Sequence, residues 1–144
     1  MDTIKQSLVI CMLMERFGRI DGRTRLQKLL FLLDKKLNLD LGFERALYGP
    51  FSNRLSAIAD TLTRDKIIKE EFSVTDFGKK YSYILTDEGK NFIKSMKSNN
   101  DIQKIEKVLN EVDSFVNMDL EELLRFIYKT YPEFAGEFKF SKSA

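Results

Sequence analysis

Eight polar side chains in three short stretches of the sequence have the types and spacing that contact duplex DNA. Lys and Arg neutralise phosphates, whereas short polar side chains and Arg read base edges in the major groove. The first stretch could bind phosphates, the second could read bases, and the third could reach the backbone or the minor groove. The predicted DNA-binding residues are Arg23, Arg25, Lys28, Asn53, Arg54, Ser56, Lys79 and Lys80.

Catalytic chemistry has little support in the sequence. The chain contains no His, which is the commonest general base and metal ligand. It also lacks a Gly-rich phosphate loop, a dinucleotide fingerprint and a Cys/His zinc spacing. Asp76 with Glu88-Gly89-Lys90 weakly resembles a magnesium nuclease arrangement, but Glu88 and Lys90 are expected at a helix start. We therefore predict a protein with no catalytic residues, no cofactor and no bound metal.

Charge is unevenly distributed along the chain, although the net charge is only +2. Residues 1–36 carry 8 basic and 4 acidic side chains, whereas residues 99–144 carry 6 basic and 9 acidic ones. The basic N-terminal segment could bind a polyanion and the acidic C-terminal segment could bind a protein. Two solvated surfaces would give the same charge pattern. Asp60, Glu70 and Glu71 would repel phosphate from the predicted DNA-binding face.

Three helices are expected to position the first two stretches. Residues 3–17 predict a helix with Ile4, Leu8, Cys11 and Met12 on its apolar stripe. A capping box of Thr24 and Gln27 is expected to start a second helix, which is apolar nearly all round and so should be buried. Gly49 and Pro50 suit the N-cap and first position of a third helix, whose inward residues are Leu55, Ile58, Ala59 and Leu62.

A β-hairpin is expected to carry the third stretch. Residues 67–74 alternate in polarity, residues 75–78 form a turn, and residues 80–85 form the second strand. Thr86 with Asp87 and Glu88 then starts another helix. The order of three helices, a hairpin and a helix predicts an α+β, mostly helical, winged-helix-like domain over residues 1–98.

The remaining residues 99–144 predict a C-terminal helical pair. Ile102, Ile105, Leu109, Val112 and Val116 form an apolar seam of about two heptads, and Asp119 with Glu122 is expected to cap the last helix. This pair could pack on the preceding domain or form a homodimer interface. The aromatic residues Phe134, Phe138 and Phe140 could dock on a partner or cover the protein's own core.

The cysteine and hydropathy patterns set the expected environment. Cys11 is the single cysteine, so no intrachain disulfide can form, and a reducing cytoplasm is the expected location. Its apolar neighbours indicate a small buried hydrophobe rather than a reactive thiol. No run approaches the ~20 apolar residues that span a bilayer, so no membrane partner is expected.

Three motifs resemble those of a family of small prokaryotic proteins. They are Leu26-Gln27-Lys28-Leu29-Leu30-Phe31, Tyr48-Gly49-Pro50-Phe51-Ser52 and Phe126-Ile127-Tyr128-Lys129-Thr130-Tyr131-Pro132-Glu133. The chain resembles the YwgA-like group, which is similar to the broader SocA-like antitoxin (Panacea) domain. This resemblance implies a winged-helix-like domain whose broader relatives act as antitoxins or proteolytic adaptors. It implies no catalytic residues.

Together these patterns favour a non-enzymatic DNA-binding protein, a prokaryotic or viral transcriptional regulator. The alternative is a protein-interaction module, either an antitoxin or an adaptor of the SocA-like kind. The expected partners are duplex DNA in the first case and a protein in the second.

Overall fold

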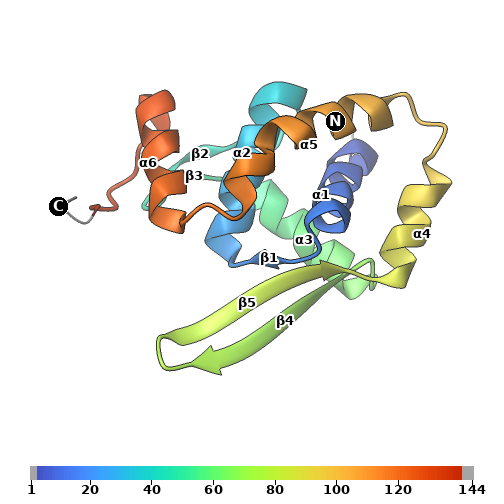
Figure 1. Ribbon diagram of the computed structural model, residues 1–144, viewed down its shortest axis with the longest axis horizontal. Helices are drawn as coiled ribbons and strands as arrows, with labels where there is room; N and C mark the ends of the chain where they lie inside the picture. The colour runs from blue at the N-terminus through green and yellow to red at the C-terminus, as the bar shows by residue number, and fades with distance from the viewer. Residues whose placement is uncertain (1–2, 141–144) are drawn as a thin grey trace.

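The computed structural model describes residues 3–140 and has an α+β fold that is mostly helical (Figure 1). The predicted ranges 1–98 and 99–144 extend beyond these residues at their outer ends. The elements in chain order are α1 Thr3–Phe17, β1 Ile20–Asp21, α2 Arg23–Leu37, β2 Glu44–Ala46, β3 Gly49–Phe51, α3 Asn53–Arg64, β4 Ile68–Thr75, β5 Gly78–Leu85, α4 Asp87–Ser95, α5 Asp101–Val116, α6 Leu120–Thr130 and the 3-10 turn Pro132–Phe134.

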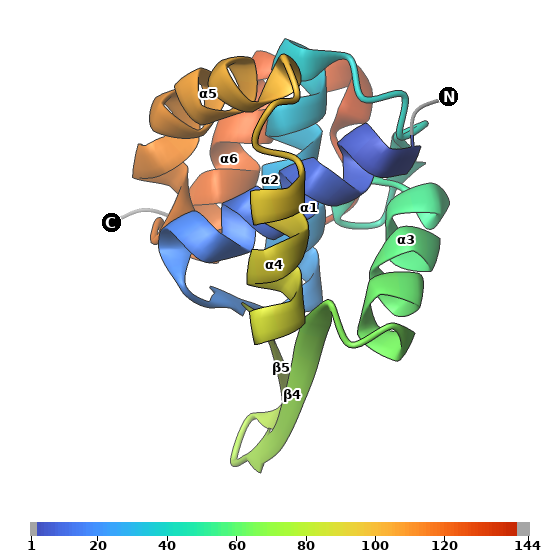
Figure 2. The same cartoon turned by 90° about the vertical axis from the view of Figure 1, so that its right-hand side faces the viewer.

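The helices α1 and α2 form the centre of the molecule, and the other helices surround them (Figure 2). Every residue from Gln6 to Met14 is buried, as is every residue from Leu26 to Leu33, because neighbours cover both helices on several sides. Cys11 is one of these buried residues, and burial raises the pKa of its thiol to about 12. The expectation for Ile4 was wrong: it is exposed, since the first turn of α1 extends beyond the core.

The β4–β5 hairpin, which we call the wing, projects away from the helices (Figures 1 and 2). The strands pair from Ile68 opposite Leu85 to Thr75 opposite Gly78, which confirms the predicted hairpin. The short β1 pairs with β5, so the sheet order is β1-β5-β4. Thr86 caps α4, as predicted, by accepting a hydrogen bond from the Gly89 amide at 3.0 Å.

A second hairpin replaces the predicted start of the third helix. Gly49 and Pro50 are not the N-cap and first residue of α3; they lie in β3, opposite Ala46 and Arg45 of β2. Gly49 has a φ of 93°, a conformation that favours glycine at the exit of the turn. The helix begins only after Ser52, whose hydroxyl is a better cap and accepts a hydrogen bond from the Leu55 amide at 2.9 Å.

The two predicted capping boxes are absent. Gly22, not Thr24, is the N-cap of α2 and provides no side-chain hydrogen bond, and Gln27 bonds to residues distant in sequence instead. Asp119 is the N-cap of α6 as expected, but its side chain makes no cap hydrogen bond. Tertiary contacts have taken priority over local capping at α2.

The C-terminal helices pack on the rest of the chain. The seam residues Ile105, Leu109, Val112 and Val116 are buried in the same core as α1 and α2. The tail after α6 then folds over the β2–β3 hairpin, where the Glu137 amide donates to the Leu47 carbonyl at 2.8 Å. Its aromatic side chains pack on other rings of the same chain: Phe134 on Phe31, Phe138 on Tyr48 and Phe140 on Tyr128.

None of the helices in residues 3–140 combines the length and apolar character that crossing a bilayer requires.

Candidate functional site

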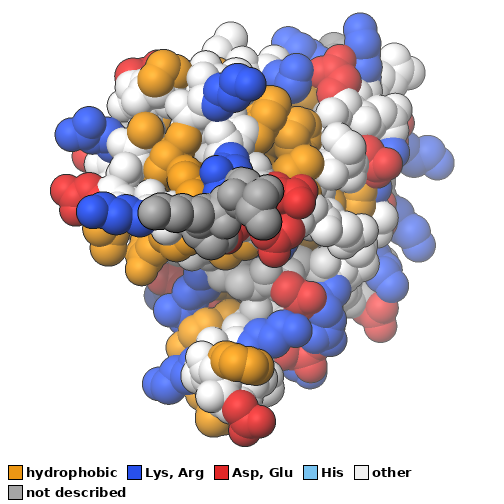
Figure 3. Space-filling model, turned by 60° about the vertical axis from the view of Figure 1, so that its left-hand side comes forward, with side chains coloured by type: hydrophobic (Ala, Val, Ile, Leu, Met, Phe, Trp, Pro, Cys, Tyr) orange, Lys and Arg blue, Asp and Glu red, His pale blue; other side chains and the backbone are white. Residues whose placement is uncertain are grey.

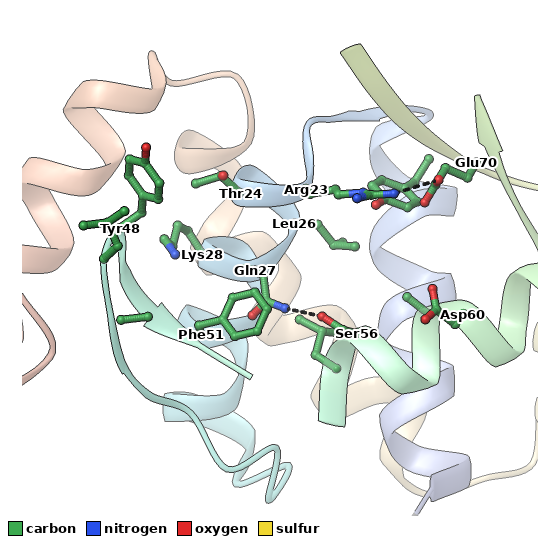
Figure 4. Close-up of a pocket in the computed structure, with 15 residues that line it drawn as sticks. Arg23, Thr24, Leu26, Gln27, Lys28, Tyr48, Phe51, Ser56, Asp60 and Glu70 are labelled. Carbon is green, nitrogen blue, oxygen red and sulfur yellow. Dashed lines mark hydrogen bonds and ion pairs between the residues drawn. The ribbon is translucent and has the colours of Figure 1, made fainter. Parts of the chain in front are cut away.

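A pocket of about 460 Å³ opens between α2, the β2–β3 hairpin, α3 and the base of the wing (Figure 4). We call it the Lys28 pocket. Its volume is within the range of about 300–1,000 Å³ that is typical of ligand sites. Both apolar and polar side chains line it, namely Leu26, Ala46, Leu47, Phe51, Leu55 and Ala59 together with Arg23, Thr24, Gln27, Lys28, Tyr48, Ser56, Asp60, Glu70 and Tyr83.

Lys28 is the most unusual residue of the pocket, because its side chain is only 2% exposed. Its ammonium donates one hydrogen bond, from Nζ to the carbonyl oxygen of Pro50 at 2.8 Å. Within residues 3–140 it forms no ion pair. Burial lowers the pKa of this amine to about 8, so it is still mainly charged at pH 7. A buried ammonium without a counter-charge is costly to keep in a fold.

Gln27 links α2 to the start of α3 beside the pocket through three hydrogen bonds. Its amide group donates to the Ser52 carbonyl at 3.0 Å and to the Ser56 hydroxyl at 3.1 Å, while its oxygen accepts from the Ser52 amide at 2.8 Å. The Ser52 hydroxyl in turn donates to the Leu41 carbonyl at 2.5 Å. These bonds fix the start of α3 against α2, so the two helices that wall the pocket keep a defined spacing.

The opposite end of the pocket holds an ion pair between Arg23 and Glu70. Arg23 donates to Glu70 at 3.3 Å, and its guanidinium lies 3.7 Å from the centre of the Tyr81 ring. Burial, with the nearby Glu70 carboxylate, raises the pKa of Tyr83 to about 12, so its hydroxyl is available to hydrogen-bond to Glu70. Figure 4 shows Arg23, Glu70 and Asp60 at one end, with Lys28 and Tyr48 at the other. One end of the pocket therefore holds the Arg23–Glu70 ion pair and the Asp60 carboxylate, and the other end holds the Lys28 cation without an ion-pair partner among residues 3–140.

The structure brings only three of the eight predicted DNA-binding residues to this pocket: Arg23, Lys28 and Ser56. Two others are held by hydrogen bonds elsewhere. Arg25 donates to the carbonyls of Val116 and Met118 at the α5–α6 junction, and Arg54 donates to Gln6 and Thr3 of α1.

The last three predicted residues stay exposed and lie apart. Asn53 is on the first turn of α3, whereas Lys79 and Lys80 are on the wing. Lys80 is 3.9 Å from Asp21, and the Lys79 ammonium lies 5.6 Å from the centre of the Phe72 ring. Lys79 and Lys80 are thus the two cations among the eight that lie on the wing.

Sequence reasoning missed the apolar rim of the pocket. Leu47 and Tyr48 form the turn between β2 and β3, Phe51 follows at the end of β3, and the three side chains are 54%, 48% and 38% exposed. Three large apolar side chains within five residues of a tight turn were a usable signal, because a turn places its side chains at the surface. The burial of Lys28 also had a signal, since the helix around it was predicted to be apolar on nearly every side.

The weak nuclease pattern is not assembled in the structure. Asp76 lies in the turn of the wing, while Glu88 and Lys90 are on α4 at the far end of the hairpin (Figure 1). Within residues 3–140, no three acidic or Cys side chains are grouped so that they could hold a metal ion.

No protein-family model matches the chain, and no curated protein does so either.

Proposed function

We propose that this protein is an interaction module that binds a segment of a partner protein in the Lys28 pocket. The observation that carries the proposal is the exposure of Leu47, Tyr48 and Phe51 around one concave site. Exposed apolar side chains gathered at a pocket are typical of binding sites, whereas isolated ones are ordinary surface. Aromatic residues at such a rim supply large contact areas with little loss of conformational entropy.

The support of the rim makes it suitable for binding. The β2–β3 hairpin is held by the tail, whose Glu137 and Phe138 amides both donate to the Leu47 carbonyl. Gly136 lies so close to Ala46, Leu47 and Gly49 that any side chain at position 136 would clash with their backbone. A preorganised rim reduces the ordering cost of binding. The resemblance to SocA-like antitoxins and adaptors also favours a protein partner over DNA.

Site-specific photo-crosslinking tests this proposal in a lysate of the source cell. Benzoylphenylalanine replaces Tyr48 at the rim in one variant and Phe77 at the wing tip in a matched control, since both positions are exposed. We expect a discrete crosslinked product from position 48 that is absent from position 77. Adding Leu47→Asp should remove it, because a carboxylate on the rim disfavours apolar contact. Identical products at both positions, or a product insensitive to Leu47→Asp, would contradict the proposal.

DNA binding is a second candidate, and the sheet order favours it. In a winged-helix domain a short strand after the first helix pairs with the second strand of the wing, as β1 pairs with β5 here. The projecting wing carries Lys79 and Lys80, and α3 exposes Asn53. Asp60 is exposed on the same helix and opposes phosphate, so the wing is the main basic element available for this role.

Salt-dependent binding to random duplex DNA tests the second candidate. Each phosphate contact contributes about 0.9 to the slope of log affinity against log salt concentration. Lys79→Glu/Lys80→Glu should lower that slope by about 2. The matched control is Lys94→Glu/Lys97→Glu, in the last turn of α4 and just after it, which makes the same change in net charge and should have less effect. Equal losses in the two variants, or a wild type that does not bind at low salt, would rule out DNA recognition by the wing.

A further inference from the structure

The geometry points to a specific partner chemistry: we propose that the Lys28 pocket binds the C-terminal carboxylate of a partner chain whose last residue is apolar. This inference rests on the proposed function and identifies the group that the site recognises. It begins from the ammonium of Lys28, which is 2% exposed and has one hydrogen bond, to Pro50. An ammonium has three N–H donors, so two have no protein partner in the described part of the chain.

The surrounding charges indicate that the missing partner is an anion. Glu70 is already paired with Arg23, and it lies with Asp60 at the other end of the pocket (Figure 4). No carboxylate of residues 3–140 compensates Lys28. A carboxylate placed beside Lys28 would form a charge-assisted hydrogen bond, which is among the stronger polar contacts in proteins. Desolvation by the pocket walls would make that contact stronger than at an open surface.

The apolar lining indicates a chain terminus rather than an acidic side chain. Leu26, Leu47 and Phe51 line the same pocket as Lys28, so the ligand must carry an apolar group close to its anion. A C-terminal residue has both groups on one α-carbon. An internal Asp or Glu has the carboxylate at the end of its own side chain and no apolar arm beside it. Capture of terminal carboxylates is a known mode of peptide recognition.

A matched pair of small probes tests the inference at pH 6.5. The first is N-acetyl-leucyl-phenylalanine, which has a free carboxylate, and the second is its C-terminal amide. Titrations followed by ¹H–¹⁵N NMR report both the affinity and the location of binding. We expect the acid to shift the amides of residues 23–28 and 46–51 and to bind at least about tenfold more tightly than the amide, since a close charge pair at a binding interface can contribute about tenfold or more to affinity.

Variants of two lysines on α2 test whether the preference for the acid over the amide depends on the charge of Lys28. Lys28→Met keeps the length and apolar character of the side chain but removes its charge, and it should bring the acid-to-amide affinity ratio close to one. Lys36→Met is the matched control, because Lys36 is exposed and pairs with Glu111 away from the pocket. It should keep the wild-type ratio. The comparison of the two probes in the wild type stands even if Lys28→Met does not fold.

Three results would overturn the inference. Equal binding of the acid and the amide would show that the pocket accepts peptides without reading the carboxylate, and this leaves the proposed function intact. Binding of hexanoate as tight as that of the acid probe would show that a simple fatty acid satisfies the site without a peptide. Absence of binding by both probes would remove the terminal-residue site, and the crosslinking experiment then decides separately whether a partner uses the rim.

Discussion

The Lys28 pocket and the wing use similar side chains in opposite ways. In the pocket, cations are buried or paired, and apolar residues are exposed only at the rim. On the wing, Lys79 and Lys80 are exposed, and so are Phe72, Val74 and Phe77. Figure 3 shows hydrophobic and basic side chains interspersed on this projecting hairpin. One region holds its groups in fixed positions, and the other presents them to solvent.

This contrast shows that residue type alone does not decide what a cation does. Lys28 and Lys79 are both lysines that were predicted to contact DNA, but the first donates to the Pro50 carbonyl inside the fold and the second lies near the Phe72 ring at the surface. A buried cation interacts strongly with a single matching ligand, since little solvent screens it. An exposed cation adds a weak, salt-sensitive attraction to any polyanion. The pocket is therefore suited to selective recognition and the wing to general electrostatic attraction.

The largest expected difference between the two regions is in stability. Gln27→Ala removes three hydrogen bonds and leaves the buried amide and carbonyl of Ser52 without these partners. We expect the free energy of unfolding to fall by about 2–4 kcal/mol, because each buried unsatisfied group costs about 1–3 kcal/mol. Urea denaturation measures the change. Gln103→Ala, at an exposed position of α5, is the control and should change stability by less than about 0.5 kcal/mol.

A Gln27→Ala protein as stable as the wild type would show that the hydrogen bonds to Ser52 do not hold α3 in place. The pocket would then be no more rigid than the wing, and the contrast between the two regions would fail.

The next effect concerns the cost of the buried charge. Lys28→Met should raise the free energy of unfolding at pH 7 by about 2 kcal/mol. A pKa lowered from 10.5 to about 8 corresponds to roughly 3 kcal/mol, and loss of the hydrogen bond to Pro50 offsets about 1 kcal/mol of that gain. Denaturation of both proteins across pH 7–10.5 checks the value. Lys79→Met on the wing should leave stability almost unchanged.

The sign of the pH dependence follows from the direction of the Lys28 shift. Between pH 8 and pH 10.5 the unfolded chain binds more protons at this residue than the folded one does, so wild-type stability from this group rises with pH. The advantage of Lys28→Met should therefore shrink over that window. A constant advantage, or a destabilised variant at pH 7, would mean that the ammonium is already compensated in the fold. A stability gain combined with lost carboxylate binding is the signature of a functional residue.

Local patterns predicted the wing and the helix order, whereas distant contacts determined the pocket. Alternation and a turn were sufficient for the hairpin, and Thr86 was identifiable as a cap from its neighbours alone. Gln27 was assigned to a capping box because that motif is local, but its partners are 25 and 29 residues away. Gly49 and Pro50 fit a helix start as well as a strand, and the helix starts later because Ser52, two residues after Pro50, caps α3.

The hydrogen bond of Lys28 is also a contact between residues that are distant in the sequence. Its partner Pro50 is 22 residues away, in a hairpin that the sequence did not indicate. The apolar character of α2 implied that any residue in its middle would be buried. A basic residue within such a helix was therefore a better candidate for a selective site than for a phosphate contact.

The affinity of the acid probe should also depend on pH, through the protonation of Lys28 in the pocket. The affinity of the acid probe should fall about tenfold between pH 7 and pH 9, because only about a tenth of the Lys28 amines then stay protonated at a pKa of about 8. The other ionisable side chains that line the pocket are Arg23, Asp60, Glu70, Tyr48 and Tyr83. Lys28→Met separates their effects from that of Lys28, since it should remove the fall entirely. A fall that persists in Lys28→Met would assign it to one of the other five.

The smallest expected effect is on the wing, where Phe77→Ser should change the free energy of unfolding by less than about 0.5 kcal/mol. Phe77 is fully exposed in a two-residue turn, so its removal uncovers no buried surface. Urea denaturation of Phe77→Ser and Gln27→Ala under the same conditions compares the stability changes at the wing and at the Lys28 pocket directly. Concentration-dependent light scattering of the same variant measures whether the exposed ring promotes association between molecules. A destabilisation above about 1 kcal/mol would show that the wing tip is packed against something in solution, and the wing would then share the pocket's fixed character.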